Sequence, residues 1–114
     1  MGAIEQLRID VRREPDRVVI ALGGELDMAS APLLQKAIEG ADLADNGMVV
    51  LDLHDLQFID STGLRVILAA RKLCTERNQE LAVTHSSQQV ERLLTVTGVA
   101  EHLRTIALPE ETSG

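Results

Sequence analysis

The sequence predicts an α/β fold with a mixed sheet of four to five strands. An alternating apolar segment and a nearly continuous apolar run flank the turn Glu14-Pro15-Asp16 near the N-terminus, which predicts an antiparallel hairpin. Further along, short β-branched runs alternate with segments whose apolar residues recur every three or four positions, as in amphipathic helices. Helices between such strands imply parallel pairing through right-handed crossovers. The 114 residues suffice for one aliphatic core, so we expect residues 1–114 to form a single domain.

The N-terminal hairpin is predicted from two different patterns. Leu7, Ile9 and Val11 alternate with charged residues, which is the period of a strand with one buried face. Residues 17–22, RVVIAL, are almost continuously apolar and are therefore expected to lie more centrally in the sheet. The pair Gly23-Gly24 is predicted to end this second strand. No G-x-G-x-x-G or G-K-[ST] pattern follows it, so a tight exit from the sheet is favoured over a phosphate-binding turn.

A helix and a buried strand are predicted next. Ser30 precedes a helix expected over Pro32–Glu39, which has proline in its first turn and ends at Gly40. Residues 42–47 are expected to form a surface loop. Val49–Leu53 is short and β-branched, and the polar pair His54-Asp55 is predicted to end it as a buried strand.

The sequence changes from strand to helix period at Asp60-Ser61-Thr62-Gly63. A second helix is predicted over Thr62–Arg77, with Asp60 or Ser61 as its N-cap. Its expected inner face consists of small and aliphatic residues at helical spacing, namely Gly63, Val66, Ile67, Ala70, Leu73 and Cys74. The lone Cys74 is therefore interpreted as a core residue rather than a nucleophile.

The C-terminal third is predicted to contain another strand and helix. Leu81–Thr84 follows a polar turn and is expected to be a short strand. Ser86 with Gln89 resembles a capping box for a third helix over Gln88–Thr97. Residues 103–108 are ambiguous and are interpreted as a short edge strand, and residues 109–114 are expected to be a frayed tail.

Composition excludes several classes of function. The net charge is −7, and the 11 Lys and Arg residues are scattered among acidic neighbours, so nucleic-acid binding is disfavoured. Phe58 is the only aromatic residue, which leaves no base-stacking platform. The three histidines have no metal-ligand spacing, and neither a metal nor a cofactor is expected. No leader and no apolar stretch near the ~20 residues of a membrane span are apparent, so a cytoplasmic location without membrane insertion is predicted.

The second helix start is the candidate functional site. A helix N-terminus offers free N–H groups and partial positive charge, which suit an anion such as a phosphate on a capping hydroxyl. Ser61 and Thr62 are the candidate acceptors, although such residues most often only satisfy the first turn. Asp27 follows the neighbouring strand and is expected close to Ser61. An acid–base pair of Asp27 and Asp60 is conceivable, but no substrate-pocket pattern accompanies it.

Three segments resemble the STAS domain, and more narrowly the bacterial anti-sigma factor antagonists. They are GGELDMASAP (residues 23–32), VVLDLHDLQFIDSTGLRVIL (residues 49–68) and VERLLTVTGVAEHL (residues 90–103), and the likeness covers about nine-tenths of the chain. The resemblance implies a partner-switching protein whose unphosphorylated form binds an anti-sigma factor, typically an ATP-dependent serine kinase, and so releases a sigma factor.

The resemblance also implies which residues act. Phosphorylation would fall on Ser61, with Thr62 as the alternative, and would end binding until a metal-dependent serine phosphatase removes the group. Asp60 and Asp27 match the acidic residues around the family's phosphorylated serine. Within the family, the alternative is a STAS subunit of a lipid-transport ABC complex, which binds an ATPase subunit without a phosphorylation cycle. The alternative from another class, a small serine or carboxylate enzyme, lacks a convergent base, so the protein is not expected to be an enzyme.

The partner-binding surface is predicted beside the phosphorylation site. On a helical wheel Leu64 and Leu68 lie on the flank of the second helix, with Arg65 and Arg71 at its polar edges. One interpretation is that this flank packs against a neighbouring helix. The other is a partly exposed apolar strip that binds the partner. Gly63 is expected to leave room for the kinase.

Overall fold

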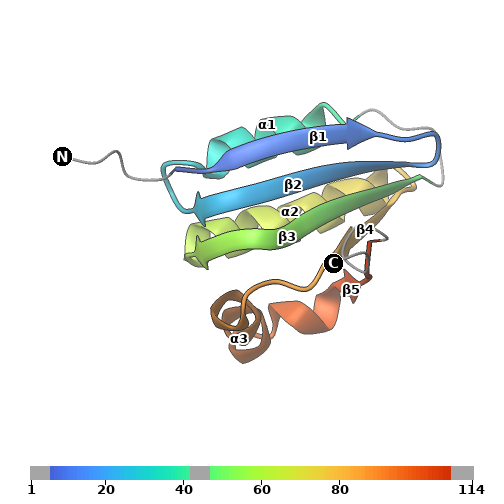
Figure 1. Cartoon of the computed structure of the whole chain (residues 1–114). Helices are drawn as coiled ribbons and strands as arrows, with labels where there is room; N and C mark the ends of the chain where they lie inside the picture. Colours follow the sequence, from blue (N-terminus) through green and yellow to red (C-terminus); the bar gives the residue numbers. More distant parts are fainter. Residues whose placement is uncertain (1–5, 42–46, 109–114) are drawn as a thin grey trace.

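A computed structural model describes residues 6–41 and 47–108 and shows a five-stranded sheet in the order β1-β2-β3-β4-β5. β1 and β2 are antiparallel, and every other neighbouring pair is parallel. α1 and α2 lie along one face of the sheet, behind the strands in the view of Figure 1, and α3 lies below β3 in that view. The predicted fold class, a mixed sheet with an N-terminal hairpin and parallel strands joined by helices, is confirmed.

The element order agrees with the prediction, and the three α-helices begin and end within one residue of the predicted bounds. The elements are β1 (Arg8–Arg13), β2 (Arg17–Leu26), α1 (Ala31–Glu39), β3 (Met48–Ile59), α2 (Ser61–Glu76), β4 (Glu80–Val83), α3 (Gln88–Val96), the 3-10 helix η1 (Val99–His102) and β5 (Arg104–Thr105). The ambiguous segment after residue 103 contains the short edge strand β5. Residues 42–46 of the expected loop and the expected frayed tail, residues 109–114, lie outside the described residues.

Two predicted strand ends are wrong. β2 continues through Gly23-Gly24 to Leu26, and β3 continues through His54-Asp55 to Ile59. The two strands pair in parallel from Arg17 opposite Met48 to Leu26 opposite Ile59, with register shifts on the way. Glycine and polar residues have a low preference for strands, so the sequence does not predict a strand there. The pairing of β2 with β3 supplies the backbone hydrogen bonds, and the side chains of His54 and Asp55 remain exposed. The extension carries both strand ends to the same edge of the sheet.

The predicted capping box at α3 is also wrong by one residue. Ser87, not Ser86, is the N-cap, and its hydroxyl accepts a hydrogen bond of 3.2 Å from the N–H of Val90. The N–H of Ser86 is satisfied instead by the carboxylate of Glu91, at 3.0 Å.

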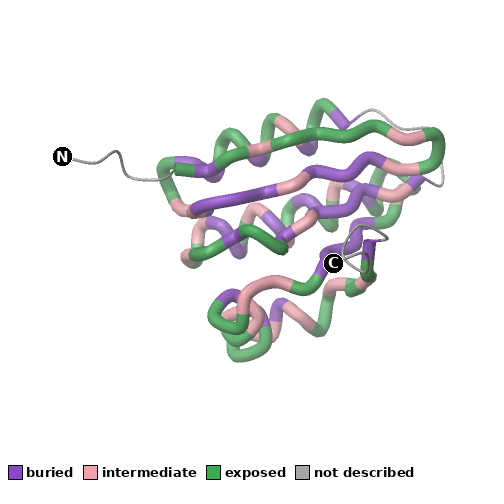
Figure 2. The backbone as a smooth tube through the Cα atoms, in the orientation of Figure 1, coloured by how far each residue is buried: buried purple, intermediate pink, exposed green. Residues whose placement is uncertain are grey.

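The hydrophobic core lies between the sheet and the helices. β2 and β3 are largely buried, whereas β1 is exposed along most of its length (Figure 2). The inner face of α2 was predicted correctly at Gly63, Ile67, Ala70 and Cys74, which are all buried. Burial raises the pKa of the Cys74 thiol, which fits a packing role.

Candidate functional site

The candidate site lies where β2 and β3 end side by side. The N–H of Asp60, just after β3, donates a hydrogen bond of 3.1 Å to the carbonyl oxygen of Leu26, the last residue of β2. Asp27 follows Leu26 directly, so the predicted approach of Asp27 to the start of α2 is confirmed. The approach depends on the parallel pairing of the two strands.

Asp60 is the N-cap of α2, which decides between the two predicted caps. One carboxylate oxygen accepts a hydrogen bond of 2.9 Å from the N–H of Gly63. The other accepts one of 3.2 Å from the N–H of Met28, in the loop between β2 and α1. Asp60 therefore joins the first turn of α2 to the neighbouring loop, and Ser61 is the first residue of the helix.

Asp27 stabilises its own loop. Its Oδ1 accepts hydrogen bonds of 3.0 Å from the N–H groups of Ala29 and Ser30. The buried hydroxyl of Ser30 in turn accepts a hydrogen bond of 3.0 Å from the N–H of Asp27. Asp27 and Asp60 thus both bind backbone amides, which is the geometry of caps rather than of an acid–base pair.

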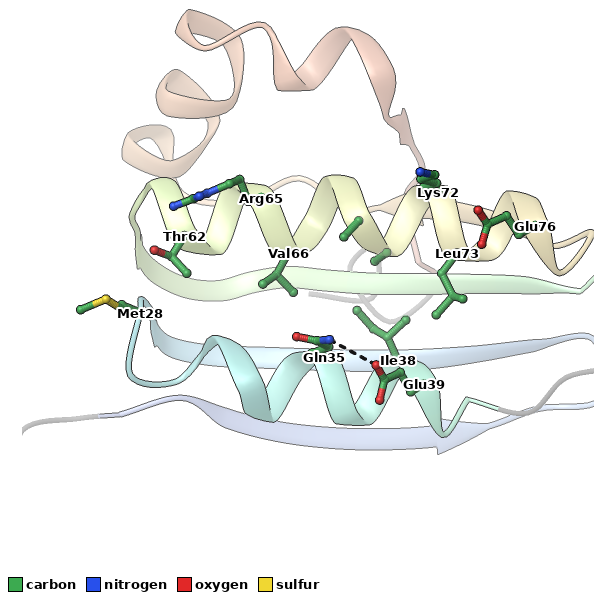
Figure 3. Close-up of a pocket in the computed structure, with 12 residues that line it drawn as sticks. Met28, Gln35, Ile38, Glu39, Thr62, Arg65, Val66, Lys72, Leu73 and Glu76 are labelled. Carbon is green, nitrogen blue, oxygen red and sulfur yellow. Dashed lines mark hydrogen bonds between the residues drawn. The ribbon is translucent and has the colours of Figure 1, made fainter.

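The two candidate hydroxyls differ in exposure. The side chain of Ser61 is exposed, whereas Thr62 is half-buried and lines a groove between α1 and α2 (Figure 3). Both belong to the first turn of α2, where N–H groups and the helix dipole favour an anion. A bulky modifying enzyme reaches an exposed hydroxyl more easily than one packed at a groove wall.

The expectation that Gly63 leaves room for a kinase is wrong. It is buried, and a Cβ at this position would lie 2.8 Å from Ile59 Cγ1 and 2.9 Å from the carbonyl oxygen of Leu26. Glycine is required because the first turn of α2 packs directly on the ends of β2 and β3. Gly63 therefore lets the first turn of α2, which carries Ser61, pack on the strand ends. It does not open the surface around Ser61.

The predicted strip on α2 is only partly present. Leu64 is 8% exposed and belongs to the hydrophobic core, so the expectation of an exposed Leu64 is wrong. Leu68 is half-buried and packs against that core, while Arg65 and Arg71 are exposed. The deviation follows from the breadth of the buried stripe, because α2 contacts β3, β4 and η1 as well as α1.

Sequence reasoning missed two exposed apolar side chains beside the site. Met28 is 74% exposed and Phe58 is 40% exposed, and they lie at the ends of β2 and β3 respectively. The only available signal was their position in the sequence, since Met28 stands within three residues of Asp27 and Phe58 within three residues of Asp60. Exposed methionine and aromatic side chains are typical of protein interfaces.

The groove between α1 and α2 has a volume of about 690 Å³. Met28 and Thr62 stand at one end, and Glu39 and Glu76 at the other (Figure 3). Between them the groove is lined mainly by aliphatic side chains of the two helices. It opens beside the candidate phosphorylation site.

Other kinds of site find little support in the part of the chain that the structure describes. Residues 6–41 and 47–108 contain no group of three or more His, Cys, Asp or Glu residues arranged to hold a metal ion. Within the same ranges, every helix is too short or too polar to span a bilayer.

Comparison with known proteins gives a consistent result. The family model described as "Mlab, STAS domain" matches residues 9–108. The anti-sigma-B factor antagonist of Listeria monocytogenes is 29% identical over 90% of both chains. The anti-sigma F factor antagonist of Paenibacillus polymyxa is 33% identical, over 82% of this chain and 80% of its own. The crystal structure of an anti-sigma factor antagonist from Mycobacterium paratuberculosis superposes with a TM-score of 0.79 and 25% identity, covering 97% of this chain and 94% of the other.

Proposed function

The chain belongs to the STAS domain family, and on this basis we propose that it acts as an anti-sigma factor antagonist controlled by phosphorylation. In its unphosphorylated form it binds an anti-sigma factor, itself an ATP-dependent serine kinase, and a sigma factor is released. The names of the relatives from Listeria and Paenibacillus support this function. Phosphorylation of Ser61 ends the binding, and a metal-dependent serine phosphatase restores it.

The position of Ser61 is the observation that carries the proposal. Its side chain is exposed on the first turn of α2, directly after a fixed N-cap. The kinase transfers the γ-phosphoryl group of ATP to the Ser61 hydroxyl oxygen, which gives up its proton, and ADP leaves. The first-turn N–H groups and the helix dipole then stabilise the phosphate where it forms.

The proposed switch acts through charge rather than unfolding. A phosphate adds about −1.5 to −2 charges at pH 7. It would stand next to Asp60, whose carboxylate is held in place by Gly63 and Met28. A partner that covers this surface must remove water from both anions, and that desolvation opposes binding. Since Asp60 already caps the helix, the fold does not depend on the hydroxyl of Ser61.

Phosphorylation by the cognate kinase tests the assignment. The purified protein is incubated with the anti-sigma factor kinase of the source organism and ATP, and tandem mass spectrometry locates the phosphate. We expect phosphate on Ser61 in the wild type and in Thr62→Val, and none in Ser61→Ala. Phosphate on Thr62 that persists in Ser61→Ala would exclude Ser61 as the acceptor. Treatment with a Mn²⁺-dependent serine phosphatase should restore the original mass.

A second candidate function is a STAS subunit of a lipid-transport ABC complex. The description of the matching family model, which names Mlab, favours it. In that case the start of α2 would bind an ATPase subunit without being phosphorylated. Stable co-purification with an ABC ATPase, unaffected by kinase and ATP, would support this alternative over the first.

A further inference from the structure

The groove between α1 and α2 has an apolar floor, where Ile38 belongs to the hydrophobic core and half-buried Val66 and Leu73 pack against that core. Val66 and Leu73 of α2 and Ile38 of α1 point into it (Figure 3). Ala69 lies between them on the lining and is exposed. A small residue at this position lets another backbone approach closely, and the larger side chains around it offer apolar contact. The floor therefore suits a side chain or helix from outside better than bulk water.

Charge is distributed unevenly along the groove. Arg65 stands at the end near Met28 and Thr62, whereas Glu39 and Glu76 stand at the far end (Figure 3). Lys72 lies on the α2 rim next to Glu76. A complementary ligand thus needs an anionic group near Arg65 and a cationic group near the two glutamates.

The α2 wall of the groove is long enough to lie along a helix, whereas α1 lines the groove only at Gln35, Ile38 and Glu39. The α2 wall extends from Thr62 to Glu76, which at 1.5 Å per residue is roughly 21 Å, or about four helical turns. Apolar floor, charged ends and this length match the recognition of an amphipathic helix through anchors at i, i+3, i+4 and i+7. A small apolar molecule would leave the charged ends unused.

We propose that this groove binds one amphipathic helix of the protein partner, with an acidic residue beside Arg65 and a basic residue beside Glu39 and Glu76. The identity of the partner, an anti-sigma factor kinase, rests on the proposed function. The surface differs from the predicted strip, because Leu64 is buried in the core and neither Leu64 nor Leu68 lines the groove. Of the predicted partner-binding residues, only Arg65 lines the groove.

The placement also connects the groove to the phosphorylation site. Met28, at the open end of the groove, is 74% exposed and is held through its backbone N–H by Asp60. Its side chain is free to contact the first turn of the bound helix. A phosphate on Ser61 would introduce negative charge at the end where the proposed helix carries its acidic residue. The same event would therefore repel the helix and weaken the attraction of Arg65.

Filling the groove provides the test. Isothermal titration calorimetry measures binding of the anti-sigma factor kinase of the source organism to the wild type and to Ala69→Trp. The control is Ala107→Trp, which changes an exposed alanine beyond β5. We expect Ala69→Trp to weaken binding more than about tenfold and the control to bind like the wild type. Circular dichroism should show the same melting temperature for all three, because both alanines are exposed.

Charge reversal tests the orientation of the helix. Arg65→Glu and Glu39→Lys should each weaken binding, whereas Arg92→Glu, on α3, should not. Hydrogen exchange should slow in α1 and α2 on complex formation and stay unchanged in α3. Unaltered affinity in Ala69→Trp, with wild-type binding intact, overturns the groove and leaves the proposed function standing.

Two other results are also decisive. Failure of the wild type to bind the kinase overturns both the proposed function and the groove assignment. Analytical ultracentrifugation without the kinase measures the oligomeric state. If the wild type is a dimer and Ala69→Trp is a monomer, the groove binds a second copy of the chain and the proposal is overturned.

Discussion

The carboxylate of Asp60 and the backbone N–H of Met28 lie 3.2 Å apart and form a hydrogen bond between residues that are 32 positions apart in the chain. The same carboxylate caps α2 through Gly63. One side chain therefore fixes the first turn of the helix, which carries Ser61, relative to the loop that carries exposed Met28. The surface around Ser61 is therefore already fixed in the unbound protein.

Replacing Asp60 should separate this positioning from general stability. Asp60→Ala removes an N-cap, which costs about 1 kcal/mol of folding free energy, and also frees the Met28 loop. We expect it to weaken binding of the anti-sigma factor more than about tenfold. Ser87→Ala removes the N-cap of α3 and serves as the matched control. Chemical denaturation and calorimetry on both variants make the comparison, and equal binding losses would show that Asp60 acts only through stability.

Substitution of Gly63 should be costly despite its small size. In Gly63→Ala the new methyl group would lie 2.8 Å from Leu26 Cγ, so α2 must shift away from the strand ends. We expect a loss of about 1–3 kcal/mol in the free energy of unfolding. In Gly40→Ala the nearest heavy atom to the Cβ is 3.4 Å away, and that variant should keep its stability. Urea unfolding curves of the two variants that coincide would contradict the packing role.

The start of α3 should make stability depend on pH. Hydrogen bonds from the N–H of Ser86 and from His85 lower the pKa of Glu91 below its ordinary value of 4.5. A carboxyl group whose pKa is lower in the folded protein than in the unfolded chain stabilises the fold. This stabilisation is complete at a pH above the pKa of the unfolded chain and disappears as the pH falls through the pKa of the folded protein. The stability difference between the wild type and Glu91→Gln should therefore be full at neutral pH and shrink below about pH 4.5.

Urea denaturation from pH 3 to pH 7 measures that difference. Glu101→Gln, which removes an exposed carboxylate from η1, controls for the change in net charge. A difference for Glu91→Gln that stays constant over the whole range would show that its hydrogen bonds do not favour the ionised form.

The order of elements was predictable because hydrophobic period is a local property. The change of period at Ser61 located the start of α2 to within one residue, and parallel pairing then predicted that Asp27 and Asp60 converge. The ends of β2 and β3 were not predictable. Gly23 and His54 are poor strand formers, and they are held in strands by pairing that the sequence does not display.

The side chains of the site were harder to predict than its location. A helical wheel places Leu64 on a flank, but whether that flank is covered depends on β3, β4 and η1. Gly63 was identified as important for the wrong reason, because its contact with Leu26 comes from a distant strand. Met28 has no signal beyond its position next to Asp27, because the hydrogen bond that holds its loop comes from Asp60, which is 32 positions away in the chain.

The central claim is that a phosphate on Ser61 prevents binding of an anti-sigma factor without disturbing the fold. Isothermal titration calorimetry of the anti-sigma factor against stoichiometrically phosphorylated protein and against the same sample after phosphatase treatment tests it most directly. We predict that the phosphorylated protein binds more than about tenfold more weakly, a difference of over ~1.4 kcal/mol, with unchanged circular dichroism, and that dephosphorylation restores the affinity. Equal affinity of the two forms would contradict the account.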